Sequence, residues 1–442
     1  MLSAFARAFR TPDLRKKILF TLAIMALFRL GSHIPAPGID YTLVEACQAA
    51  ATQGATTALG FANLFSGGAL LQLSIFALGI MPYITAAIIV QLLTVVIPRF
   101  EALKKEGQSG QAKMTQYTRY LTIGLAVLQS STLVTFARNP SSLFGTQSCT
   151  TVMPNDGTVT ILIMVLTMTA GTGLIMWLGE QITERGIGNG MSLLIFTAIA
   201  AGFPASLGAI WTEKGWTTFA LVIAIGLVIM TMVVFVEQSQ RRIPVQYAKR
   251  MIGRRQYGGT STYIPLKLNM ANVIPIIFAS SILTLPTLIA GFNRPNDGSV
   301  PPDWVTWIDT YLGFGTNQTH WIYMLLYVAL IIFFTFFYVS VTFDPVDVAE
   351  NMKKYGGFIP GIRAGRPTAE YLSYVITRIT TPGAIYLAGL ALIPLIAFNL
   401  LNTSTDFPFG GASILIIVGV GLQTVKQIES QLQQHDYEGF LR

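Results

Sequence analysis

Apolar and polar positions along this chain are arranged in long blocks rather than with the short periods of soluble helices or strands. Ten apolar runs are each about 17–25 residues long, the length that an α-helix needs to cross the hydrocarbon core of a bilayer. The pattern predicts ten membrane-spanning helices, and an even number places both termini on one side. The runs cover about residues 18–34, 73–97, 117–137, 158–179, 191–207, 217–236, 271–291, 321–343, 382–401 and 410–427.

Composition supports the membrane interpretation. Of the 442 residues, 52% are hydrophobic and 11% are charged, whereas soluble domains carry about 25% charged residues. A chain this poor in charge cannot cover a soluble surface, so lipid must cover it.

The net charge of +8 could also indicate nucleic-acid binding, but the distribution of the charged residues points to the membrane. Arg138, Lys214 and Arg294 fall in odd-numbered loops and Arg29 inside the first run, while the other 25 of the 29 Lys and Arg residues lie in the termini, the even-numbered loops or at their edges. The positive-inside rule therefore predicts that the termini and even-numbered loops are cytoplasmic.

The first apolar run resembles a signal peptide, because five basic residues from Arg7 to Lys17 precede it. It ends, however, at Pro35-Ala-Pro-Gly38 without a small-x-small cleavage site. We therefore expect it to be a retained first span. Arg29 lies near its outer end, where a charge in lipid is costly, and we expect it to anchor the helix.

Two cytoplasmic loops, about 237–269 and 344–381, are long and basic. Their charges could serve only to fix topology beside anionic lipids. Their length, and their Gly and Pro content, favour a second role as projecting surfaces that bind RNA or an acidic protein.

A short apolar segment, residues 59–71, precedes the second span and is interrupted by Gly67-Gly68. It is too short to cross a bilayer. A half-helix at membrane depth is tolerated only inside protein or beside a water-filled cavity. We expect an external re-entrant segment, with a surface amphipathic helix as the alternative.

Catalytic signatures are missing from the sequence. There is no phosphate-binding loop, and His33, His320 and His435 are too far apart for a metal motif. Glu180 and Glu184 fall at the short fourth loop, where water is at hand, and no carboxylate pair stands out within the spans. We therefore predict neither enzyme activity nor a cofactor or metal. A passive conduit, a scaffold or a transporter with unusual coupling remains.

Several long motifs carry a family resemblance. They are Phe65-Ser-Gly-Gly-Ala69, Ser74-Ile-Phe-Ala-Leu-Gly-Ile-Met-Pro-Tyr-Ile84, Gln116-Tyr-Thr-Arg-Tyr120, Trp177-Leu-Gly-Glu-Gln-Ile-Thr-Glu-Arg-Gly-Ile-Gly-Asn-Gly190, Gln240-Arg-Arg-Ile-Pro-Val-Gln-Tyr-Ala-Lys-Arg250, Pro265-Leu-Lys-Leu-Asn-Met270, Ile277-Phe-Ala-Ser-Ser-Ile282 and Phe358-Ile-Pro-Gly-Ile-Arg-Ala-Gly-Arg366. From the first span to the last, the chain resembles the SecY family, the protein-conducting channel subunits of bacteria.

The resemblance implies an all-α integral membrane protein whose ten transmembrane helices form two inverted five-helix halves, residues 1–208 and 209–442. The re-entrant segment would be a plug half-helix that closes the channel from outside. A lateral gate towards lipid would lie between spans 2–3 and spans 7–8. The plug residues singled out are Phe61, Asn63, Leu64, Phe65, Ser66, Gly67 and Gly68.

The family's central constriction is a ring of apolar side chains. Matched to this sequence, the ring comprises Ile80, Ile84, Met191, Ile195, Ile277 and Ile416. A narrow apolar collar loses its water and blocks ions, and it can still yield around an extended polypeptide. Met191 stands where Ile is more usual, and its bulk is similar. Without the motifs, each of these residues would be read as an ordinary core or lipid-facing side chain.

The resemblance also implies partners and a location. The long cytoplasmic loops would bind the SecA motor ATPase or the ribosome through Arg254, Arg255 and Arg363. Small membrane subunits resembling SecE and SecG, signal sequences, nascent chains and anionic lipids complete the expected partners. The location would be the bacterial inner membrane, with multiple spans.

Two cysteines, Cys47 and Cys149, fall in the first and third external loops. The oxidising exterior permits a disulfide between them, and two free thiols are the alternative.

Two functions compete with a protein-conducting channel. One is a secondary transporter of a small solute, which should show a polar cluster at mid-membrane. The other is a scaffold or insertase without a pore.

Overall fold

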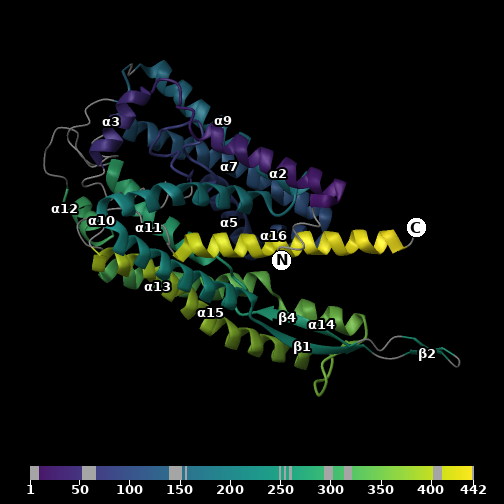
Figure 1. Cartoon of the computed structure of the whole chain (residues 1–442). Coiled ribbons are helices and arrows are strands. Elements are labelled where there is room, and N and C mark those ends of the chain that lie inside the picture. Colours follow the sequence, from purple (N-terminus) through teal and green to yellow (C-terminus); the bar gives the residue numbers. More distant parts are fainter. Residues whose placement is uncertain are drawn as a thin grey trace.

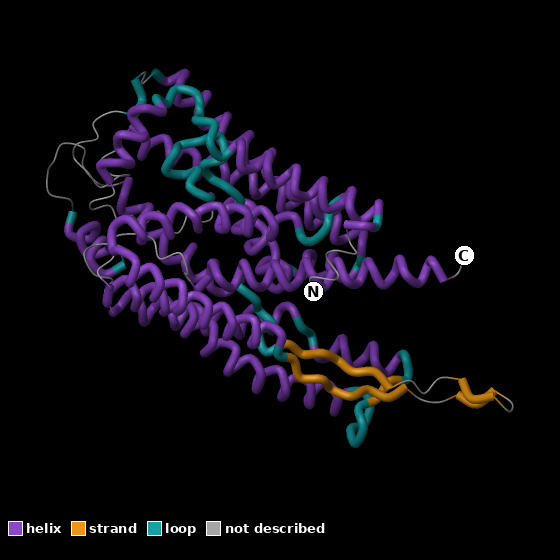
Figure 2. Tube along the Cα trace, viewed as in Figure 1, coloured by secondary structure: helices purple, strands orange, loops and turns teal. Residues whose placement is uncertain are grey.

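The structure is a computed structural model that describes residues 9–51, 66–138, 152–154, 157–247, 250–252, 255–257, 261–292, 302–312, 321–401 and 411–440. Most of its helices run roughly along one direction, and a pair of strands projects from one end (Figures 1 and 2). Many large apolar side chains are exposed, including Phe235 (75%), Leu128 (66%) and Leu325 (61%). Surfaces of this kind are covered by lipid in multi-pass membrane proteins.

The N-terminal half contains α2 (Pro12–Gly31), α3 (Tyr41–Ala51), α5 (Met81–Val96), α6 (Pro98–Lys105), α7 (Gln108–Arg138) and α9 (Thr158–Arg185). The long α10 (Gly190–Gln238) follows and breaks at Gly215, whose φ is 78°. Its two legs, Gly190–Thr212 and Gly215–Gln238, are the fifth and sixth spans. Helix α9 packs against α2, α7 and the first leg of α10.

The C-terminal half contains the second leg of α10 and six helices, α11 (Ile274–Phe292), α12 (Asp303–Tyr311), α13 (Trp321–Thr342), α14 (Pro345–Lys354), α15 (Arg366–Leu401) and α16 (Gly411–Phe440). Helix α13 lies between α11 and α15, while α16 packs against α10. The core of this half is buried between the second leg of α10 and α11, α13, α15 and α16, with Val233, Ile331 and Leu387 among its fully buried side chains.

The ten predicted spans correspond to α2, α5, α7, α9, the two legs of α10, α11, α13, α15 and α16. Six of these are long and apolar enough to cross a membrane by length and composition alone among the described residues. The pair α5–α6, bent by 101°, would make a seventh. Charges such as Arg15, Lys16 and Lys17 lower the hydropathy of α2.

The second span begins later than predicted. Residues 67–80 form a series of turns, and the helix starts only at Met81. Gly67, Gly68 and Gly79 have positive φ, as does Leu73 at 48°, which prevents a continuous helix. Of the predicted half-helix 59–71, residues 59–65 lie outside the described residues, Ser66 is helical and residues 67–71 form turns.

The first long basic loop forms β-structure that the sequence did not indicate. Strand β1 (Gln240–Tyr247) pairs antiparallel with β4 (Ser261–Lys267), Ile243 lying opposite Ile264. Strand β5 (Gly357–Phe358) adds to β1, and β2 (Arg250–Ile252) pairs with β3 (Arg255–Tyr257). Ile243 and Val245 are buried against residues of α15, whereas their neighbours along β1 are exposed.

The second long loop is shorter than predicted, because α15 already begins at Arg366. Strands β1, β2 and β4, helix α14 and the C-terminal end of α16 lie towards one end of the molecule in Figure 1, while α3 and α12 lie at the other. The two basic loops therefore share one end, in agreement with the charge distribution.

The turn segment 67–80 fits closely against α9, which leads to a first prediction. A Cβ at Gly171 of α9 would collide with the backbone oxygen of Ile75, whereas a Cβ at Gly173 would meet nothing within 4 Å. We expect Gly171→Ala to destabilise the protein by about 1–3 kcal/mol through overpacking. Gly173→Ala, on the same helix, should be neutral or stabilising by up to about 1 kcal/mol. Thermal unfolding of both variants in mild detergent measures the difference, and equal midpoints would contradict this packing.

Candidate functional site

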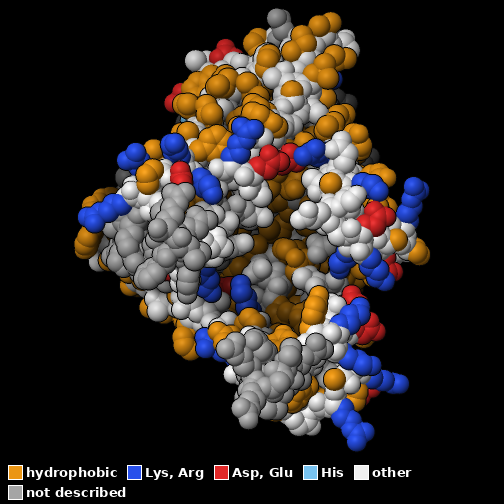
Figure 3. Space-filling model, turned by 90° about the vertical axis from the view of Figure 1, so that its right-hand side faces the viewer, with side chains coloured by type: hydrophobic (Ala, Val, Ile, Leu, Met, Phe, Trp, Pro, Cys, Tyr) orange, Lys and Arg blue, Asp and Glu red, His pale blue; other side chains and the backbone are white. Residues whose placement is uncertain are grey.

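The end of the molecule that carries the basic loops is hollowed at its centre. Figure 3 views this end directly and shows hydrophobic side chains on the floor of the hollow, with Lys and Arg side chains around its rim.

An apolar cluster at the centre of the fold contains all six predicted ring residues. Ile80, Ile195, Ile277 and Ile416 are buried, with 2–8% of each residue exposed, and Ile84 and Met191 are partly buried against them. They come from the start of α5, the first leg of α10, α11 and α16, so both halves contribute. The structure thus brings the six side chains together, and their role as an ion seal stays a prediction.

Local features of the chain place these side chains. Ile80 and Ile84 lie one helical turn apart, and the Ile84 amide donates to the Ile80 carbonyl over 3.1 Å. Asn189 caps α10, its Oδ1 accepting from the Ser192 amide over 3.2 Å. A Cβ at Gly190 would collide with the backbone of Gly179 in α9. The glycines of the Arg-Gly-Ile-Gly-Asn-Gly motif therefore allow α9 and α10 to cross closely enough to set Met191 in the cluster.

The described part of the predicted plug begins at Ser66, which is buried. Its hydroxyl accepts from the Leu70 amide over 3.1 Å. Gly67 lies against Ala198 of α10. Phe61, Asn63, Leu64 and Phe65 lie outside the described residues, so the plug stays a prediction.

A small cavity separates α5 of one half from α11 and α13 of the other. Its lining is apolar apart from Gln91 and the Tyr338 hydroxyl, and comprises Ile88, Gln91, Leu92, Phe278, Phe334, Phe337, Tyr338 and Val341. Phe278 and Phe334 stack with ring centres 5.0 Å apart. The cavity marks a seam between the halves at the place where the resemblance puts the lateral gate. The gate itself stays a prediction.

A lysine of α6 reaches across the seam on the side of the basic loops. Lys104 of α6 approaches the Val341 carbonyl of α13 at 3.4 Å. Lys105 donates to Glu101 over 2.8 Å, which lowers the pKa of Glu101 and raises that of Lys105. Asp347, near the start of α14, adds to the raised pKa of Lys105. These groups are exposed, so each contact contributes little on its own.

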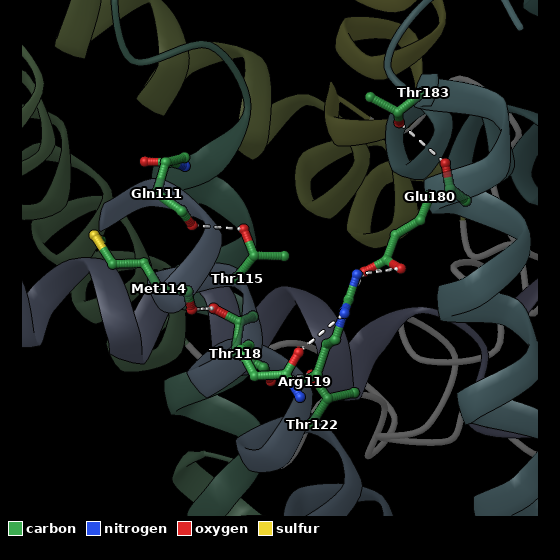
Figure 4. Close-up of polar contacts among 10 residues, drawn as sticks. Gln111, Met114, Thr115, Thr118, Arg119, Thr122, Glu180 and Thr183 are labelled. Atoms are coloured by element: carbon green, nitrogen blue, oxygen red, sulfur yellow. Dashed lines mark hydrogen bonds and ion pairs between the residues drawn. The ribbon is translucent and has the colours of Figure 1, made fainter. Parts of the chain in front are cut away.

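Arg119 of α7 and Glu180 of α9 form an ion pair with two hydrogen bonds (Figure 4). Both nitrogen–oxygen distances are 2.8 Å, and Arg119 also donates to Gln116 Oε1 over 3.0 Å. The sequence placed Glu180 at a loop, whereas the structure places it inside α9. Both residues lie in motifs that carry the family resemblance. These motifs were the only indication in the sequence that Arg119 and Glu180 matter together.

Of the predicted partner-binding residues, Arg363 lies exposed in the turn between β5 and α15, and its carbonyl accepts from Thr368 Oγ1 over 2.8 Å. Arg255 lies in β3, at the far tip of the projecting strands. Arg254 lies outside the described residues. Binding by these residues stays a prediction.

Cys47, in α3, is buried and disulfide-bonded. The chain contains one other cysteine, Cys149, which lies outside the described residues. The pairing of the two therefore stays a prediction.

The fold and its central hollow define a multi-pass helical membrane protein whose two halves meet at an apolar cluster. The SecY family profile matches residues 74–425. The proteins named "Protein translocase subunit SecY" from Streptomyces galbus and Micrococcus luteus are 63% and 58% identical to this chain, and each alignment covers 100% of both chains. The chain belongs to the SecY family.

Solved structures share the fold. "The structure of a protein conducting channel" matches with a TM-score of 0.62 at 18% identity, covering 94% of this chain and 91% of that chain. "Sec61 in the Canine ribosome-channel complex from the endoplasmic reticulum" matches with a TM-score of 0.59 and the same coverage and identity. The fold thus persists where most of the sequence has changed.

The apolar cluster leads to a second prediction. An Asn at position 277 would place a polar group in the apolar cluster between the halves and favour water there. We expect Ile277→Asn to raise the resting ion conductance of membrane vesicles. Ile282→Asn is the matched control, because Ile282 lies on the same helix and is 38% exposed. Equal conductance of both variants and the wild type would show that residue 277 does not form a seal.

The ion pair between Arg119 and Glu180 leads to a third prediction. Its side chains are 37% and 18% exposed, so solvent screens part of the attraction, and we expect Glu180→Gln to cost about 1 kcal/mol of stability. Glu101→Gln removes a pair whose side chains are 67% and 56% exposed and should change stability by less than about 0.5 kcal/mol. A thermal double-mutant cycle with Arg119→Gln measures the coupling, and additive effects would contradict it.

Proposed function

We propose that this protein is the channel through which unfolded secretory polypeptides cross the plasma membrane of a bacterium, and from which transmembrane segments pass sideways into lipid. The observation that carries the proposal is the apolar cluster, to which α5 and the first leg of α10 contribute from one half and α11 and α16 from the other. Aliphatic side chains bind no particular residue of a passing chain, so they can surround any sequence while excluding hydrated ions.

The seam between α5 and α11–α13 supplies the lateral exit. An apolar signal sequence that reaches it gains about 0.3–0.6 kcal/mol for each large apolar residue moved into lipid. A stretch of ten such residues gains about 3–6 kcal/mol, which is of the order needed to shift a closed–open equilibrium from 1:99 to 99:1. Polar segments lack this gain and leave the seam closed, so signal sequences are separated from the rest of the chain by partitioning.

Energy and partners come from outside the channel in this proposal. Arg363 and the strands β1–β4 project on the side of the basic loops, where a motor ATPase such as SecA or a ribosome would dock by charge complementarity. The match to a channel solved in a ribosome complex supports the second partner. SecE-like and SecG-like subunits would join the halves 1–208 and 209–442 in the membrane. Both termini of this chain would lie in the cytoplasm.

Two observations favour a channel over the alternatives. A secondary transporter needs polar groups at its central site, whereas the side chains that α5, α10, α11 and α16 bring together between the halves include four buried isoleucines. A scaffold or insertase without a pore needs neither a hollow nor an apolar floor beneath it, and Figure 3 shows both.

Photocrosslinking tests the proposal. A photoreactive residue at Leu92 or Phe278, which line the seam, should crosslink to the signal sequence of an arrested secretory chain. The same residue at Leu325, which is 61% exposed on α13, should crosslink mainly to lipid. If all three positions label the arrested chain equally, or none does, the proposed path of the polypeptide is wrong.

A further inference from the structure

Arg29 lies in the first span, where a charge is costly unless it has a polar partner. Its Nη1 donates to the backbone carbonyl of Gly67 over 2.6 Å. Gly67 belongs to the end of the proposed plug segment, 38 residues further along the chain. The contact therefore joins the outer part of α2 to the base of that segment.

The chain that follows Gly67 is fixed firmly to α2 and the loop after it. The Ala36 amide donates to the Leu73 carbonyl over 3.0 Å, and the Ile75 amide donates to the Ile34 carbonyl over 2.9 Å. Phe28 stacks on Phe76 with ring centres 6.0 Å apart. Arg29 extends this series of contacts towards the proposed plug, so it lies between the firmly packed turns and that segment.

The two glycines at this boundary differ in their surroundings. Gly67 has φ +67°, and a Cβ there would lie 3.0 Å from the Ala198 Cα in α10. Gly67 is thus held between Arg29 on one side and α10 on the other. Gly68 has φ +89°, and a Cβ there would meet nothing within 4 Å. Gly67 is therefore held by its neighbours, whereas Gly68 has free space around it.

We propose that Arg29 is a positioning residue that latches the base of the plug in the closed channel. The inference rests on the proposed plug. A hydrogen bond from a charged donor is strong in dry, apolar surroundings and weak in water, which competes for the same groups. The latch therefore stabilises the closed, dry state and loses its advantage once the opened channel fills with water.

Ion conductance of inner-membrane vesicles containing each full-length variant tests the latch. We expect Arg29→Met, which keeps the length of the side chain but not its donors, to raise resting conductance about tenfold, equivalent to about 1.4 kcal/mol. Arg29→Lys keeps a charged donor, so its resting ion conductance should be lower than that of Arg29→Met. Arg185→Met removes an exposed arginine at the end of α9 and should behave as wild type. The same ranking is expected for export of a substrate with a defective signal sequence.

Deletion of residues 59–65 separates the latch from the plug. If Arg29 acts through the plug, Arg29→Met combined with the deletion should conduct no more than the deletion alone. A further increase would show that Arg29 acts elsewhere, and wild-type conductance of Arg29→Met at equal protein level would overturn the latch. If the deletion alone does not raise ion conductance, the assignment of residues 59–71 as a plug is wrong. Should Arg29→Met not accumulate, Gly67→Ala disturbs the same contact from the other partner and is expected to leak as well.

Discussion

The rest of this structure depends on the packing of aliphatic side chains where two groups of helices meet. Such side chains offer neither charge nor hydrogen bonds, and a narrow collar of them sheds water, so the proposed channel can exclude ions and still admit a polymer of any sequence. Ile80, Ile195, Ile277 and Ile416 come together only because two groups of helices converge on them. The close crossing of α9 and α10 at glycines serves that convergence.

The spans were largely predictable, because long apolar blocks and the asymmetry of Lys and Arg follow directly from the bilayer. The ring residues were not predictable from hydropathy, since Ile277 and Ile282 look alike in sequence although one is buried and the other is exposed. Only the family motifs selected them. Burial depends on which helix face meets the other half, and an almost uniformly apolar helix has no polar face to show it.

Other features were missed for identifiable reasons. The turns over residues 67–80 have the composition of a helix, and positive φ at Leu73 comes from tertiary packing rather than from residue preference. Strands β1 and β4 contain alternating buried and exposed residues, but Pro244 and Pro265 obscured the pattern. Glu180 looked solvent-exposed because its partner, Arg119, is 61 residues away in sequence.

The break at Gly215 has a consequence for how the molecule is assembled. Here the fifth span ends and the sixth begins, so a single stretch of main chain connects the two proposed halves. Everything else that unites them is non-covalent, from aliphatic packing to the approach of Lys104 to Val341. The molecule is thus equivalent to two five-helix subunits that share one tether, and a polypeptide cut at that point would still possess every helix needed to build the passage.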